Sequence, residues 1–280
     1  MIWQCRDFAL SLDRVRVMGI VNVTPDSFSD GGKWCDVATA VAHGLKLVEE
    51  GADLVDVGGE SSRPGAVEVP VEEELRRVLP VVKELAARGA RVSVDTRRAE
   101  VARQALDAGA CAVNDVTAGA DERMFEVVRD ARAGMVLMRG WKADMECGDL
   151  SPLSIECKAA INRRTPYYLA QRVSAALDAG IAREALVIDP GVGFTNNAEE
   201  DAALLRGIDR FSKIAPVMVG VSRKRFIGKI SGEAEPSQRL GGSLAAALFA
   251  VSRGARIVRA HDVAATAQAL KVWGELNHGE

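Results

Sequence analysis

Polar side chains that could carry out chemistry recur at the ends of short, apolar, β-branched runs along this chain. In chain order they are Asn22, Asp56, Asp95, Asn114 with Asp115, Arg139, Asp189, Ser222 with Arg223 and Lys224, and Arg259 with His261. A single Asp at the end of a strand is often only a capping residue. A whole series of carboxylates, amides and cations in this position instead indicates one convergent polar pocket.

The cations of this pocket come late in the chain, with one exception in an early glycine-rich loop. They are Arg223, Lys224, Arg225, Arg259 and His261, and the exception is Arg63. Guanidinium groups and an imidazolium on one face indicate a ligand that carries a phosphate or a diphosphate. A solvated basic edge is the alternative interpretation.

Carboxylate and amide oxygens are supplied at other strand ends, by Asp95, Asn114 and Asp189. A planar heterocycle with an amino group beside a ring N–H presents two parallel donors, which one carboxylate can accept as a pair. Together with the cations, these residues describe a ligand with a donor-rich nitrogen heterocycle at one end and a charged tail at the other.

The elements that must position these residues are eight apolar runs, each followed by a helical stretch with apolar residues at three- and four-residue spacing. The runs are 16–23, 54–57, 92–95, 112–114, 135–138, 186–189, 217–220 and 257–259. The helical stretches are 37–50, 71–87, 100–108, 124–131, 167–179, 199–208, 240–253 and 263–276. Nearly continuous apolar strands are typical of a parallel sheet that helices cover on its outer face.

Eight such units predict an α/β fold, a (β/α)8 TIM barrel, as a single domain over residues 1–280. A doubly wound open sheet is the alternative, but it normally has a Gly-x-Gly-x-x-Gly sequence after its first strand, and this chain has none there. In a barrel, the active site lies at the carboxyl ends of the strands, where the polar series stands. Residues 140–164 fit no unit, so we expect an excursion or lid on the loop face, or a disordered loop.

The composition, with 48% hydrophobic and 27% charged residues, is that of an ordinary soluble globular protein. A net charge of -3 argues against a dedicated nucleic-acid binder. The five cysteines are odd in number and form no Cys-x-x-Cys pair, which favours free thiols over disulfides or a zinc site. No run approaches the roughly 18 apolar residues of a membrane span. We therefore expect a cytoplasmic protein without membrane partners.

Seven segments at these strand ends resemble the dihydropteroate synthases, the folate-pathway enzymes that join 6-hydroxymethyl-7,8-dihydropterin diphosphate to 4-aminobenzoate. The segments are Asn22-Val-Thr-Pro-Asp-Ser-Phe-Ser-Asp-Gly-Gly32, Asp56-Val-Gly-Gly-Glu-Ser-Ser-Arg-Pro-Gly65, Ser93-Val-Asp-Thr96, Val113-Asn-Asp115, Asp189-Pro-Gly191, Gly220-Val-Ser-Arg-Lys224 and Arg259-Ala-His-Asp-Val263. The resemblance extends from Val17 to Gly274 and implies a transferase that acts as a homodimer on small-molecule substrates.

The resemblance also implies roles for individual residues. The pterin ring would be held by Asp95, Asn114, Asp189 and Lys224, with Arg259 along its face. The diphosphate would be held by Asn22, Arg63, Arg259 and His261, and Asn22 would also meet a Mg²⁺ ion that the phosphates mainly bind. The aminobenzoate pocket would be formed by Phe28, Ser62, Pro64, Phe194, Ser222 and Arg223.

In this chemistry, we expect the protein to catalyse mainly by stabilising the leaving group. An aromatic amine is neutral at pH 7, so its lone pair is available without a strong general base. Cations and Mg²⁺ would stabilise the departing diphosphate, while Asp95 would stabilise a cation at the exocyclic carbon. We therefore expect a dissociative substitution with Asp95, Lys224 and Asn22 as catalytic residues. Residues 24–32 are expected to form a lid that completes the aminobenzoate site after the pterin binds.

Two segments depart from the family's usual pattern. Leu137-Met138-Arg139-Gly140-Trp141 stands where the family usually has Met-His-Met-x-Gly, and Gly193-Phe194-Thr195-Asn196 stands where it usually has Gly-Phe-Gly-Lys. Both changes flank the aminobenzoate side. They predict weaker binding of sulfonamide mimics than in enzymes with the usual segments, a difference that inhibition assays measure.

Two other functions stay open at this point. A non-catalytic pterin-binding paralogue would keep the ring pocket without condensing anything. A methyltransferase that passes a methyl group from methyltetrahydrofolate to a corrinoid partner would also bind a pterin. Neither gives a reason for a diphosphate site at Asn22, Arg63 and His261.

Overall fold

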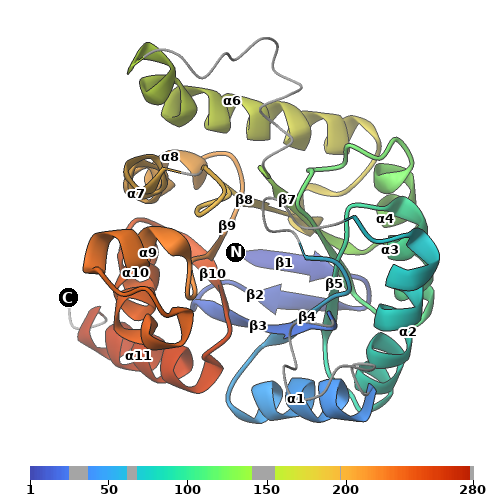
Figure 1. Ribbon diagram of the computed structural model, residues 1–280. Coiled ribbons are helices and arrows are strands. Elements are labelled where there is room, and N and C mark those ends of the chain that lie inside the picture. The colour runs from blue at the N-terminus through green and yellow to red at the C-terminus, as the bar shows by residue number, and fades with distance from the viewer. Residues whose placement is uncertain (25–36, 62–67, 141–154, 196, 278–280) are drawn as a thin grey trace.

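Eight parallel strands close into a barrel in the computed structural model, as the sequence predicts (Figure 1). They are β3 (Arg16–Asn22), β4 (Leu54–Gly58), β5 (Val92–Asp95), β6 (Ala112–Asp115), β7 (Gly134–Met138), β8 (Leu186–Asp189), β9 (Val217–Gly220) and β10 (Ala255–Ala260). The last strand pairs with both β9 and β3, which closes the sheet and excludes the open doubly wound alternative. The structure describes residues 1–24, 37–61, 68–140, 155–195 and 197–277.

Helices surround the barrel on its outer side (Figure 1). They are α1 (Val37–Glu49), α2 (Val71–Ala87), α3 (Ala99–Asp107), α4 (Met124–Ala131), α6 (Ile155–Asp178), α7 (Ala198–Arg206), α8 (Ile208–Phe211), α9 (Arg225–Ser231), α10 (Leu240–Ser252) and α11 (Val263–Asn277), with 3-10 turns η2 (Arg183–Ala185) and η3 (Pro236–Gln238). Their apolar stripes pack against the outward-facing strand residues in one large buried cluster. None of the helices in the described ranges has both the length and the apolar character needed to cross a membrane.

The helix α6 begins much earlier than the sequence pattern predicts. The prediction starts a helix at residue 167 and treats 140–164 as an excursion or loop, whereas the structure has a helix from Ile155. The prediction is therefore wrong for residues 155–164, and the rest of that segment, 141–154, lies outside the described residues. Proline is usually found in the first turn of a helix, but Pro166 lies inside this one.

A β-hairpin that the sequence analysis does not anticipate closes the amino end of the barrel. Its strands are β1 (Ile2–Cys5) and β2 (Phe8–Ser11). The Trp3 side chain is fully buried, and its indole N–H donates to the carbonyl oxygen of Ala185 at 2.9 Å. The hairpin packs against the apolar residues that fill the barrel interior. With the amino end closed, a ligand can enter the barrel mouth only from the carboxyl end of the strands.

The alternation of side chains along the strands decides which residues reach that mouth. Seven strands each place one residue in the apolar layer inside the barrel, and these are Met18, Leu54, Ala112, Val136, Val187, Met218 and Ile257. Successive side chains point to opposite faces of a strand, so the residue two positions later on each strand also points inward. On four of these strands a polar residue of the candidate site stands in this position, directly above the apolar layer.

Candidate active site

The inward-facing residues at the carboxyl end include half of the twelve that the sequence series singles out. On β4, β6, β8 and β10 they are Asp56, Asn114, Asp189 and Arg259, each two residues beyond a residue of the apolar layer. Asp95 follows buried Ser93 on β5 by the same spacing, and Asn22 ends β3. The closed barrel therefore brings together residues that are up to 237 positions apart in the chain.

Arg259 joins two of these carboxylates. Its Nε donates to Asp56 Oδ2 at 2.6 Å, and its Nη2 donates to Asp95 Oδ2 at 2.8 Å. Asp56 is fully buried, so its ion pair with this guanidinium is shielded from water. Burial acts to lower the pKa of Arg259, but the two carboxylates outweigh it and raise that pKa above its ordinary value. Arg259 is consequently a permanent cation at the centre of the mouth.

Asp56 has a structural role that the sequence analysis did not assign to it. Besides Arg259, its Oδ2 accepts a hydrogen bond from Asn114 Nδ2 at 2.9 Å. Within the described residues, the remaining side-chain oxygens of the pair, Asp56 Oδ1 and Asn114 Oδ1, are buried without a hydrogen-bond partner. Buried acceptors normally have donors, so these two atoms are suited to N–H groups of a ligand. The signal for Asp56 was its place at a strand end, but no sequence pattern pairs it with Arg259.

Burial raises the pKa of Asp95 to about 7, and the charges of Asp56, Glu74 and Asp115 add to this effect, while Arg259 opposes it. Burial likewise raises the pKa of Asp189, against the opposing charge of Lys224. With this value, Asp95 changes charge close to neutral pH. Two carboxyl groups with raised pKa values in one polar mouth are typical of a functional site.

Lys224 and Phe194 lie together on the side of the mouth formed by β8 and β9. The ammonium Nζ is 4.7 Å from the centroid of the Phe194 ring, and it donates to the carbonyl oxygen of Val192. Burial lowers the pKa of Lys224 to about 8, although Asp189 favours the charged form. A Cβ at Gly193 would lie 2.2 Å from Lys224 Cδ, and this residue has φ +92°, so glycine is required for this contact.

The remaining late cations are engaged with partners of their own. His261 Nδ1 lies 3.0 Å from Ser222 Oγ, which also accepts from the backbone N–H of His261. Arg223 makes a two-pronged ion pair with Asp262, at 3.0 Å from Nε and 2.5 Å from Nη2. The sequence analysis counts Arg223 among the cations available to a ligand, but Asp262 already neutralises it here.

The strand-end residue Asp115 serves the backbone rather than a ligand. Asp115 faces away from the barrel interior and accepts from the backbone N–H groups of Thr117 and Gly119, both at 2.7 Å. Arg139, in the first of the two unusual segments, is buried, and its backbone N–H donates to Asp189 O at 3.0 Å. In the second unusual segment, Thr195 Oγ1 donates to Asp201 Oδ1 at 2.8 Å. Thr195 therefore helps to fix the loop that carries Phe194.

Four of the expected site residues, Phe28, Ser62, Arg63 and Pro64, lie outside the described residues, as does the expected lid from residue 25 onward. Among the residues that the structure does describe, no three His, Cys, Asp or Glu side chains are placed to hold a metal ion. Asn22, at the end of β3, is a partly exposed amide with a hard oxygen donor. It suits Mg²⁺, which commonly keeps few protein ligands and binds mainly to the phosphates of a substrate.

Comparison with known proteins extends the likeness over nearly the whole chain. A family model described as pterin binding enzyme matches residues 18–261. The dihydropteroate synthase of Neisseria meningitidis serogroup B is 44% identical, over 98% of this chain and 97% of that protein.

Solved structures give the same result. The dihydropteroate synthase of Xanthomonas albilineans with 4-aminobenzoic acid superposes with a TM-score of 0.90 at 48% identity, covering 100% of this chain and 99% of that one. The same organism's enzyme in complex with 7,8-dihydropteroate gives a TM-score of 0.87 at 45% identity, covering 100% of both chains. The present chain therefore belongs to the pterin-binding enzyme family and, within it, to the dihydropteroate synthases.

Proposed function

We propose that this protein condenses 6-hydroxymethyl-7,8-dihydropterin diphosphate with 4-aminobenzoate to give 7,8-dihydropteroate and diphosphate. The observation that carries the proposal is the partly buried Arg259, held between Asp56 and Asp95 at the mouth of the barrel. Relatives that bear the name of this reaction cover almost the whole chain, and solved relatives hold 4-aminobenzoic acid and 7,8-dihydropteroate.

In this proposal the pterin ring lies among Asp95, Asn114, Asp189 and Lys224, with Arg259 along its face. Two features support this placement. The unpartnered oxygens of Asp56 and Asn114 can accept ring donors, and Asp189 keeps one carboxylate oxygen beyond the bond that its Oδ1 accepts from the backbone N–H of Gly191. The mouth is also lined by groups of both charges, which suits a heterocycle with both donors and acceptors.

The diphosphate would lie toward Asn22, Arg63, Arg259 and His261. The permanent charge of Arg259 supports this assignment, and the part assigned to Arg63 rests on the family resemblance. Mg²⁺, when bound, would neutralise part of the charge on the diphosphate, and Asn22 is the residue that would contribute a protein oxygen to it. His261 would direct its ring toward the same end, oriented by Ser222.

The aminobenzoate would bind beside Phe194, whose ring is held by the contact with Lys224. Ser222 and Arg223 would form the adjoining wall, where a substrate carboxylate would compete with Asp262 for the guanidinium of Arg223. Phe28, Ser62 and Pro64 complete this pocket in the proposal on the strength of the family resemblance alone.

The proposed mechanism is a dissociative substitution. The amine nitrogen of aminobenzoate is uncharged and needs no base, so the protein acts on the departing diphosphate and on the carbon it leaves. Arg259 stabilises negative charge on the leaving group, Lys224 helps to hold the pterin ring, and the ionised carboxylate of Asp95 stabilises positive charge spread over the pterin and its exocyclic carbon. The surrounding burial strengthens both interactions.

The kcat/KM for the pterin diphosphate is expected to rise with pH through about 7 and to fall above about 8. Burial keeps Asp95 protonated at lower pH, so the stabilising carboxylate forms only as the pH passes its raised pKa. Lys224 loses its charge early on the alkaline side because burial lowers its pKa. Initial rates between pH 5.5 and 9.5 measure the profile. Asp95→Asn should remove the acid limb, and a flat profile in the unaltered protein would contradict both assignments.

The function itself is tested by incubating the protein with the pterin diphosphate and Mg²⁺, with and without 4-aminobenzoate. Dihydropteroate and diphosphate should appear in equal amounts when aminobenzoate is present. Binding of the pterin without either product would indicate a silent paralogue. Methyl transfer from methyltetrahydrofolate, without diphosphate release, would indicate the methyltransferase.

We also propose that the protein works in the cytoplasm as a homodimer. The support for a dimer is an exposed apolar face on α10 and α11, where Phe249, Val272 and Leu276 are 43%, 55% and 77% exposed. Apolar surface of this extent on adjacent helices is typical of an interface.

A further inference from the structure

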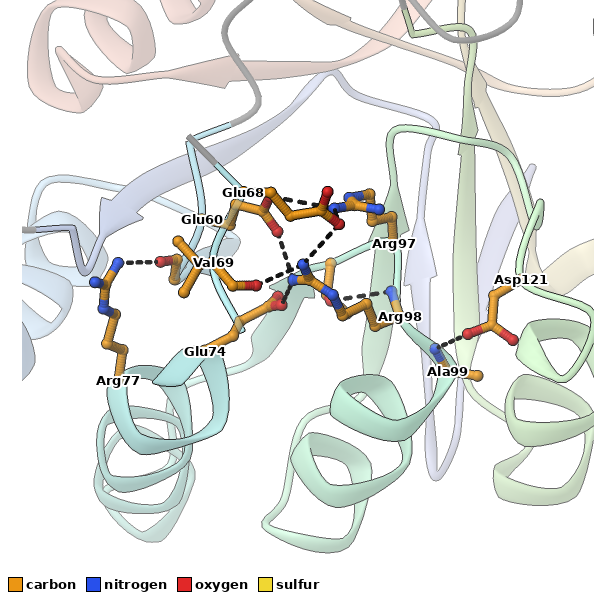
Figure 2. A network of polar contacts seen from close by, with 11 residues as sticks. Glu60, Glu68, Val69, Glu74, Arg77, Arg97, Arg98, Ala99 and Asp121 are labelled. Atoms are coloured by element: carbon orange, nitrogen blue, oxygen red, sulfur yellow. Dashed lines mark hydrogen bonds and ion pairs between the residues drawn. The ribbon is translucent and has the colours of Figure 1, made fainter. Parts of the chain in front are cut away.

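Two consecutive arginines at the start of α3 bind both ends of the segment between β4 and α2. Glu60 lies near the start of that segment, Glu68 and Val69 lie near its end, and the side chains of Arg97 and Arg98 reach all three (Figure 2). None of these contacts belongs to the site described above. The arginines nevertheless follow Asp95 by only two and three residues.

Arg98 makes the larger number of these contacts. Its Nη1 donates to Glu60 Oε2 at 2.5 Å and to a carboxylate oxygen of Glu74 in the first turn of α2. Its Nη2 donates to the carbonyl oxygen of Val69 at 2.6 Å and to Glu68 Oε1 at 3.3 Å. A single planar guanidinium therefore holds the start of the segment, its end and the first turn of α2 (Figure 2).

These contacts differ from an ordinary surface network because two of the side chains are largely shielded from solvent. The side chains of Glu74 and Arg98 are 1% and 12% exposed, whereas Glu68 is 68% exposed. Arg98 is the ion-pair partner of the buried Glu74 carboxylate, and removal of one partner of a buried ion pair is strongly destabilising. The contacts of Arg98 with Glu60, Glu74 and Val69 should therefore persist in solution, while that with Glu68 contributes little.

The same network is tied to the candidate site through the ends of β4 and β5. Gly58 is paired with Asp95, and a Cβ at Gly58 would lie 3.3 Å from Asp95 Cβ. The next residue, Gly59, is held through its carbonyl oxygen by Arg77 Nη1 at 2.9 Å. On the other strand, the backbone N–H of Arg98 donates to Thr96 Oγ1 at 3.2 Å. The backbone from Asp95 to Arg98 is thus held at both ends, by strand pairing at Asp95 and by this hydrogen bond at Arg98.

We propose that Arg98 is a positioning residue. It fixes Glu60 and Val69 at the carboxyl end of β5, and it thereby sets the position of the chain that leaves β4 relative to the pterin-ring pocket. Arg98 touches neither substrate. This inference rests on the proposed condensation, because its effect is read out in the reaction with aminobenzoate. Misplacement of about 1 Å by a change distant from the chemistry can slow a reaction by roughly 100-fold.

The test is Arg98→Lys, which keeps a positive charge beside Glu74 but cannot hold Glu60, Glu74 and Val69 with one planar group. At saturating pterin diphosphate, the kcat/KM for 4-aminobenzoate is expected to fall by about 10- to 100-fold. The Kd for 6-hydroxymethylpterin, which lacks the diphosphate, should stay within about twofold because its ring pocket is built from other strand ends.

Arg103→Lys is the matched control, since Arg103 lies on the same helix, is 51% exposed and pairs with Glu100 and Asp107 there. It should leave every parameter unchanged. Glu60→Gln is the second variant, because it weakens the contact of Arg98 with Glu60 without leaving Glu74 unpaired. It should lower kcat/KM for aminobenzoate while the melting temperature changes little. Its effect should also be smaller in the Arg98→Lys background than in the unaltered protein.

Two results would overturn the inference. One is an active parent protein whose Arg98→Lys and Glu60→Gln variants keep the same kcat/KM for aminobenzoate. The other is a loss of activity that only parallels a loss of pterin binding and of melting temperature, as unfolding would produce. A parent protein that binds the pterin but forms no dihydropteroate would instead contradict the proposed condensation.

Discussion

Replacement of Asp95 by asparagine is expected to lower kcat by about 100- to 1000-fold, while the Kd for the pterin diphosphate changes far less. Asparagine keeps an oxygen that can accept from Arg259 Nη2, so the guanidinium that holds the diphosphate stays in place. It removes the negative charge that stabilises the developing cation. Single-turnover rates and equilibrium binding measure the two quantities separately, and equal losses in both would contradict the role given to Asp95.

The same variant should be more stable than the parent at pH 8. A carboxyl group with a raised pKa binds its proton more tightly in the folded than in the unfolded chain. Its contribution to stability is therefore present at low pH and is lost as the pH rises through about 7. Asparagine cannot ionise, so its melting temperature should exceed that of the parent at pH 8, and the difference should shrink or vanish at pH 5. A lower melting temperature at pH 8 would show that the ionised carboxylate stabilises the fold.

Arg259→Met is expected to impair both the fold and ligand binding. It leaves the fully buried Asp56 without its cation, and breaking a buried ion pair in this way costs about 3–5 kcal/mol of unfolding free energy. The same change removes a charged donor from the diphosphate, and the Kd for the pterin diphosphate should rise by about 10- to 150-fold, given about 1.5–3 kcal/mol for one lost charged hydrogen bond. Denaturant unfolding and titration calorimetry measure the two effects.

A second substitution separates these effects. Asp56→Asn combined with Arg259→Met removes both charges, so most of the lost stability should return, while the weak binding of the diphosphate should remain. Arg256→Met, on the same strand, is the control and should leave binding unchanged. Recovery of diphosphate binding in the double variant would show that Arg259 acts through the fold rather than on the ligand.

The positions of the strands could be predicted because each is a short apolar run bounded by turn residues. Val92–Asp95, Leu186–Asp189 and Val217–Gly220 begin and end where the sequence pattern predicts. The same pattern supplies the inward direction of Asp95, Asn114 and Asp189, since alternation along a strand and closure of the barrel together fix the face on which a side chain lies.

What could not be predicted depends on contacts between distant parts of the chain. The opening hairpin has too few residues to show a period, and it is defined by its packing against the barrel interior. The sequence counts Arg223 and Arg259 as equivalent cations, yet Asp262 engages the first and Asp56 with Asp95 the second. The role of Arg98 could not be predicted from the sequence either, because a polar stretch does not distinguish a buried arginine from an exposed one.

The most direct test of the dissociative condensation is the secondary isotope effect of two deuterium atoms on the exocyclic methylene carbon of the pterin diphosphate, measured in single turnovers with aminobenzoate. If the C–O bond breaks ahead of attack by the amine, that carbon becomes planar and cationic, and the protonated substrate should react faster than the deuterated one. A rate ratio at or below unity would mean that the amine attacks while the diphosphate is still bound, and that Asp95 stabilises no separate cation.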